Sequence, residues 1–147
     1  MLHTIGKKWF ILTIVSNLCI LVGAGHGAGP LGLFEVVAVT NISRFTLSFS
    51  ASYEESLAAA SWFALIGQIL LITAIVIKND ALRFRVGIAG LLSQWLGFFY
   101  LTHNYFAGID DVSRFSFVTG IPFLIFSGLL TYKMIRYKFA AREVYEE

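Results

Sequence analysis

Two histidines lie inside long uncharged stretches of the sequence, where an imidazole could hold a cofactor. His26 falls near one end of the stretch 9–34, and His103 falls near one end of the stretch 86–109. With a helical rise of ~1.5 Å per residue, both side chains would lie about 10 Å from the middle of a membrane-spanning helix. Two histidines at matched depth on two helices are the smallest arrangement that ligates haem b or contributes to a metal site.

A second set of polar side chains lies near the middle of the same kind of stretch. It consists of three amides and one hydroxyl: Asn17, Gln68, Gln94 and Ser127. Amides are costly in hydrocarbon unless they are hydrogen-bonded. We therefore predict one interhelical polar layer inside the membrane that holds the helices together. The functional alternative is a homo-oligomeric channel in which the amides line or gate the pore.

Helical phase separates the amides from the histidines. His103 is nine residues from Gln94, and His26 is nine residues from Asn17, which is about 180° at ~100° per residue. Small residues that mark a closely packed helix face lie on the same side as Gln94: Gly87, Gly90 and Gly97. We therefore expect the amides to face the bundle and the histidines to bond headgroups, loop carbonyls or water. Binding of haem b by His26 and His103 is the alternative.

Four membrane-spanning helices are needed to position these side chains. The stretches without Asp, Glu, Lys or Arg are 9–34, 56–77, 86–109 and 115–132, and each is long enough to cross a bilayer as a helix of ~20 residues. Only 14% of the residues are charged, compared with about a quarter in soluble domains. We predict an all-α integral membrane protein, kinked at Pro122. Its single domain, 1–147, would be a four-helix bundle with spans at about 9–28, 56–77, 86–106 and 115–133.

The basic residues predict the orientation of this bundle. Nine of them lie on one side of the predicted membrane: Lys7, Lys8, Lys78, Arg83, Arg85, Lys133, Arg136, Lys138 and Arg142. Arg44 and Arg114 lie on the other side. The positive-inside rule then places both termini in the cytoplasm, in a plasma membrane or a bacterial inner membrane. The net charge of +2 is accounted for by anionic lipid headgroups, and it does not indicate a nucleic-acid partner.

The long outer loop, about 29–55, has a pattern of its own. Apolar side chains alternate there with Thr and Ser: Phe45, Leu47, Phe49 and Tyr53. This period of two predicts a half-buried strand in a small β-hairpin over the outer mouth of the bundle. The strand would either close the bundle or pair its edge with a partner chain. An interfacial helix over Leu33 to Ile42 is the alternative for the first part of this loop.

Carboxylates also gather on the predicted outer side: Glu35, Glu54, Glu55, Asp110 and Asp111. Such a group could hold a divalent cation, but carboxylates in loops are usually solvated or lie at helix N-termini. We therefore interpret them as surface residues.

No catalytic motif occurs in the sequence. The predicted function is that of a small non-enzymatic membrane protein, a subunit or assembly component of a membrane complex. Its partners would be the lipid bilayer and either further copies of itself or other membrane subunits. A redox subunit that uses His26 and His103, and a channel, are the two alternatives.

Overall fold

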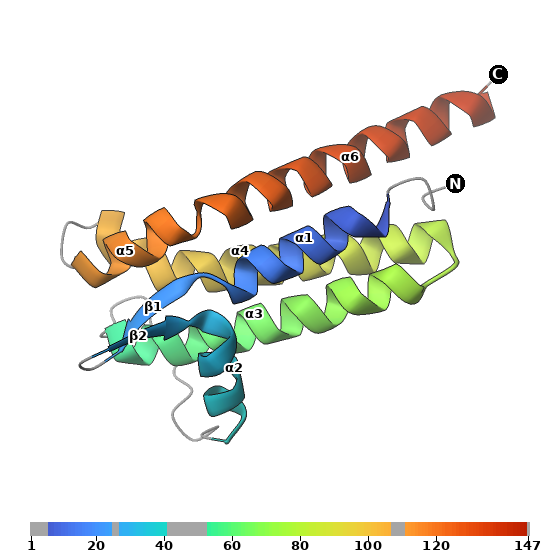
Figure 1. Ribbon diagram of the computed structural model, residues 1–147. Coiled ribbons are helices and arrows are strands. Elements are labelled where there is room, and N and C mark those ends of the chain that lie inside the picture. The colour runs from blue at the N-terminus through green and yellow to red at the C-terminus, as the bar shows by residue number, and fades with distance from the viewer. Residues whose placement is uncertain (1–5, 25–26, 41–52, 107–110, 147) are drawn as a thin grey trace.

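The computed structural model describes residues 6–24, 27–40, 53–106 and 111–146 (Figure 1). Within these residues the chain forms helices joined by short connections and one small antiparallel sheet. The elements are α1 (Lys7–Leu18), β1 (Leu21–Ala24), β2 (Gly27–Pro30), α2 (Leu31–Thr40), α3 (Tyr53–Val76), α4 (Asp80–Phe106), α5 (Asp111–Thr119) and α6 (Ile121–Glu146).

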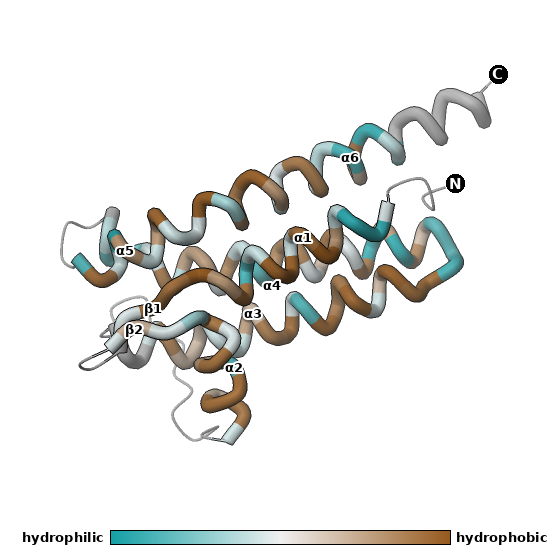
Figure 2. Tube along the Cα trace, in the orientation of Figure 1, coloured by the Kyte–Doolittle hydropathy of each residue, from teal (hydrophilic) through white to brown (hydrophobic). Residues whose placement is uncertain are grey.

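Helices α1, α3, α4 and α6 run along a common direction (Figure 1). The start of α1, the turn between α3 and α4 and the last turns of α6 lie at one end of this bundle. The hairpin of β1 and β2 lies at the other end with α5, whereas α2 extends sideways from the bundle. Figure 2 shows that the long helices are mainly apolar along their length and hydrophilic at the first of these ends.

Two helices are long and apolar enough to cross a membrane, Ser56–Val76 and Asp80–Tyr105. Helices α5 and α6 make a third candidate if they are counted as one span bent by 49°. These findings confirm the prediction of a mostly helical chain with helices that suit a membrane.

The first predicted span differs from the structure, because the helix expected over 9–28 ends at Leu18. Beyond that residue the chain forms the hairpin of β1 and β2, in which Leu21 pairs with Pro30 and Ala24 pairs with Gly27. Glycines at 23, 25, 27 and 29 and Pro30 explain the change, because each glycine costs a helix about 1 kcal/mol and proline costs more. Among the described residues the only sheet is therefore the one at 21–30, and the strand predicted from Phe45 to Phe49 lies outside these residues.

The last predicted span bends at Gly120 and not at Pro122. Gly120 separates α5 from α6, and the ring of Phe98 on α4 occupies the space that a side chain there would need. Pro122 is the second residue of α6, where its missing N–H lies in the first turn and breaks no helical bond.

The buried side chains form two clusters along the bundle. One, near the hairpin, includes Ile20, Val22, Leu31, Leu57, Phe98 and Phe123. The other, near the basic end, includes Phe10, Ile14, Leu71, Leu91, Leu130 and Met134.

Arg83, expected in a loop, lies in the first turns of α4 and is buried with its guanidinium 5.3 Å from the Phe10 ring centre. This stacking lets the cation pack against an aromatic face at the basic end of the bundle.

Helices α3 and α4 approach each other closely at glycines. A Cβ atom at Gly97 would lie 2.8 Å from the Ala60 carbonyl oxygen, and one at Gly67 would lie 2.7 Å from the Gly90 carbonyl oxygen. Gly87 instead lies against Met134 of α6. Gly90 and Gly97 thus lie on the α3 side of α4, whereas Gly87 lies on its α6 side. Such backbone contacts are typical of helices that associate in lipid.

Gly97→Ala is expected to lower the free energy of unfolding by about 1–3 kcal/mol, because the added methyl group would meet backbone atoms that cannot rotate away. Unfolding of the purified protein in mixed micelles, followed by circular dichroism, measures this change. The control is Gly128→Ala, because a Cβ at Gly128 meets nothing within 4 Å. Equal effects of the two substitutions would contradict the close packing of α3 on α4.

Candidate functional site

A cluster of three polar side chains lies buried where α1, α2 and α3 meet. The Gln68 side-chain amide nitrogen donates one hydrogen bond to Asn17 Oδ1, over 3.1 Å, and another to Glu35 Oε1, over 2.7 Å. An amide nitrogen carries two protons, so both are used. All three side chains are buried, Glu35 with 3% of its surface exposed. The three residues come from three different helices and meet at this one amide.

The hairpin brings Asn17 and Glu35 to the same place. It turns the chain back toward the end of α1, where the Leu31 N–H donates to the Ile20 carbonyl oxygen over 2.7 Å. Helix α2 begins at this point and lies close to α1, because a Cβ at Gly32 would be 2.8 Å from Leu18 Cδ2. The start of α2 at this point therefore places Glu35, its fifth residue, beside Gln68.

Helix α2 has its charge inside and its apolar side chains outside. Its buried residues are Leu31, Glu35 and Ala38, which are spaced to lie on one helical face. Its exposed large side chains are Leu33, Val36, Val37 and Val39. A helix in water would place the carboxylate outward, so this arrangement suits an apolar environment.

Burial raises the pKa of Glu35 from 4.5 to about 7, and the hydrogen bond from Gln68 acts in the opposite direction. Glu35 belongs to the short helix α2, which is not among the helices long enough to cross a membrane. A carboxyl group with this pKa exchanges a proton near neutral pH. The Glu35 carboxyl group can therefore take up one proton while it accepts the Gln68 hydrogen bond, and the charge on α2 depends on pH.

The structure links two of the four residues of the predicted polar layer, since Asn17 and Gln68 are bonded directly. Gln94 is buried on α4, with its amide nitrogen and oxygen unpartnered among the described residues. Its Cγ lies against Gly67, which is the neighbour of Gln68 in sequence. The Ser127 hydroxyl donates to the Leu124 carbonyl oxygen of its own helix over 3.3 Å.

Glu35 is the residue that the sequence analysis placed wrongly, as a surface carboxylate. A signal for it exists, because Glu35 is the only charged residue between Lys8 and Arg44. A single charge in a long apolar segment is usually buried and functional in a membrane protein. Of the other predicted outer carboxylates, Asp111 is exposed at the start of α5. The described residues contain no group of three or more His, Cys, Asp or Glu side chains arranged for a metal ion.

His103 is half-buried near the end of α4, with its Nδ1 atom 2.8 Å from the Tyr100 carbonyl oxygen. Its Nε2 atom is buried without a partner among the residues that the structure describes.

Four other predicted site residues lie outside the described part of the chain: His26, Phe45, Leu47 and Phe49. Tyr53 is the first residue of α3 and not the end of a strand. Comparison with protein-family models, curated proteins and solved structures found no match for this chain.

Glu35→Gln is expected to flatten the pH dependence of stability between about pH 4.5 and 7. The pKa of Glu35 in the folded protein, about 7, exceeds the ordinary value of 4.5, so the folded state binds more protons in this range. The free energy of unfolding of the unmodified protein should therefore fall as the pH rises toward 7 and then level off. Unfolding measured at a series of pH values checks this.

The matched control is Asp111→Asn, which neutralises an exposed carboxylate in the first turn of α5. It should leave the fall in stability between these pH values in place. A Glu35→Gln protein with the same pH profile as the unmodified chain would show that Glu35 is not the titrating group.

Proposed function

We propose that the chain is a small non-enzymatic membrane subunit that crosses the membrane four times and assembles with itself or with a larger membrane complex. The observation that carries the proposal is the arrangement of α2. This helix is fixed to the bundle by the Glu35–Gln68 hydrogen bond, and it presents an apolar face on its outer side.

The crossings would be α1 with β1, then α3, then α4, then α5 with α6. A helix of 12 residues followed by a strand of 4 extends roughly 30–35 Å, at ~1.5 and ~3.3 Å per residue, which is the thickness of a bilayer core. Where the backbone is not helical inside the membrane, its N–H and C=O groups must form hydrogen bonds to other parts of the protein. Here β2 pairs with β1, and the Thr119 hydroxyl lies 3.1 Å from the Leu21 nitrogen and accepts its N–H.

The orientation with both termini in the cytoplasm is supported by the basic residues at one end of the bundle. The first turn of α1 carries Lys7 and Lys8, and α4 carries Arg83 and Arg85 near its start. The later part of α6 carries Lys133, Arg136 and Lys138. All three segments lie at the same end in Figure 1, which the positive-inside rule assigns to the cytoplasm.

Helix α2 is the element best suited to contact another protein. Its 10 residues extend about 15 Å, which is too short to cross a bilayer. Val36, on its outer face, is 66% exposed. Contact with lipid would not require a fixed orientation of α2, whereas contact with another protein does. The buried hydrogen bond of Glu35 provides that fixed orientation.

A photo-crosslinking amino acid in place of Val36 is expected to form an adduct heavier than the 16.3 kDa chain in intact membranes. The control is the same replacement at Ile72, a 52% exposed residue of α3 that should contact lipid. Denaturing gels followed by mass spectrometry would identify the adduct as a second copy or another subunit. Monomer alone at position 36, or equal adducts at both positions, would contradict assembly through α2.

A second candidate function is haem b or metal binding through His103, and one observation favours it. Histidines that bind metals commonly bond a backbone carbonyl through one ring nitrogen and bind the metal through the other. His103 has this arrangement, with Nδ1 at the Tyr100 carbonyl oxygen and Nε2 without a partner among the described residues. His26 would supply the second ligand.

Under this second proposal, the protein purified from haem-supplemented cells shows a Soret band that His103→Ala abolishes. The control is His103→Met, which keeps a haem ligand and should shift the absorbance rather than remove it. A colourless unmodified protein would exclude haem binding, and it would leave assembly through α2 untouched.

A further inference from the structure

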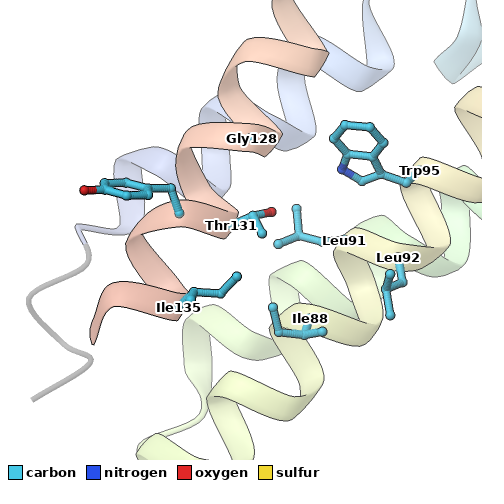
Figure 3. A pocket seen from close by; sticks show the side chains of 8 residues that line it. Ile88, Leu91, Leu92, Trp95, Gly128, Thr131 and Ile135 are labelled. Atoms are coloured by element: carbon cyan, nitrogen blue, oxygen red, sulfur yellow. The ribbon is translucent and has the colours of Figure 1, made fainter. Parts of the chain in front are cut away.

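An apolar groove of about 500 Å³ lies between α4 and α6. Figure 3 shows Leu91 and Trp95 of α4 and Thr131 and Ile135 of α6 facing the space between the two helices. Its α4 wall includes Ile88, Leu92 and Trp95, and its α6 wall includes Gly128, Thr131 and Ile135. The exposed parts of these walls lie on the outer surface of the bundle, which is where lipid meets a membrane protein.

Side-chain contacts between α4 and α6 bound the groove at its two ends, and Gly87 of α4 also lies against Met134 of α6. At one end the ring centre of Phe123 on α6 lies 5.6 Å from that of Phe98 on α4. At the other end the Lys138 ammonium of α6 lies 4.8 Å from the Phe84 ring centre on α4. Gly128 has no Cβ to fill the space between, and a Cβ placed there would touch nothing within 4 Å.

The Lys138 end of the groove is strongly basic. Arg85 is one helical turn from Ile88, and Arg136 is one turn from Tyr132, which also lines the groove. Both arginines are exposed, and their spacing places each on the groove side of its helix. Asp80 is the only acidic residue of α4, and α6 contains none before Glu143. The positively charged side chains therefore lie at one end of the apolar groove.

We propose that this groove binds one acyl chain of an anionic phospholipid of the bilayer, with the phosphate group held by Arg85 and Arg136. The apolar stretch from Ile88 to Trp95 is about 10 Å long, at ~1.5 Å per residue. It is bounded by side-chain contacts at both ends, so it fits a flexible hydrocarbon chain better than another helix. Arginine is also the side chain that binds phosphate through two parallel hydrogen bonds. The proposal rests on membrane insertion and not on assembly through α2.

The test uses the full chain with Trp9 and Trp62 replaced by phenylalanine, so that Trp95 is the only tryptophan. The protein is reconstituted into phosphatidylcholine vesicles that contain phosphatidylglycerol or phosphatidylcholine brominated in the middle of the chain. Bromine quenches nearby tryptophan. The expected result is a preference of at least about fivefold for the anionic lipid, since one basic residue near a membrane surface contributes about that factor.

Three variants make the result specific. The double variant Arg85→Gln/Arg136→Gln should lose the preference, whereas Arg114→Gln, an exposed arginine of α5, should keep it. Gly128→Leu should fill the groove and lower the quenching of Trp95 by both brominated lipids.

The proposal would be overturned if both brominated lipids quenched Trp95 equally in the protein that keeps Arg85 and Arg136. A preference that survives the loss of both arginines, or quenching unchanged by Gly128→Leu, would also overturn it. If native mass spectrometry shows a dimer that Gly128→Leu dissociates, the groove holds a second copy and the lipid proposal is wrong.

Discussion

The two hydrogen bonds donated by Gln68 hold the first third of the chain against the rest. One reaches Asn17 on α1, and the other reaches Glu35 on α2. Without Gln68, an amide oxygen and a carboxyl group would be buried without these bonds, at about 1–3 kcal/mol for each neutral group. The position of α2 therefore depends on one side chain of α3. Both the pH response and the outer apolar face of α2 follow from this attachment.

The α3–α4 contact and the α4–α6 contact differ in how closely the helices pack. Helices α3 and α4 touch backbone to backbone at Gly67, Gly90 and Gly97. Helix α6 instead meets α4 through side chains, including Phe98 with Phe123, Phe84 with Lys138, and Met134 against Gly87. Backbone contacts leave no space for lipid, whereas separated side-chain contacts leave a groove. The α3–α4 pair is thus closely packed, and α2 and α6, which contribute to the two candidate contact surfaces, pack against it.

The sequence predicts the elements well where apolar composition alone decides them. Segments 56–77 and 86–106 contain no proline, and their glycines are at least three residues apart, so the helices there lie close to the predicted ranges. In 9–28 the same composition hides a change from helix to strand, because apolar content does not distinguish the two and the alternating glycines begin inside the predicted span. Glu35 was missed because α2 returns inward to Gln68. Gln94 lies beside Gly67, the neighbour of Gln68, but its amide makes no hydrogen bond within the described part of the chain.

The hydrogen bonds between Leu21 and Thr119 join residues that are 98 positions apart. A nascent chain is made from its N-terminus, so β1 leaves the ribosome long before α5 exists. Until α5 arrives, the edge of β1 that faces it has no protein partner at this point and must find one in water or in the insertion machinery. The hydrogen bonding of this N-terminal segment is thus completed only after α3, α4 and α5 have been made.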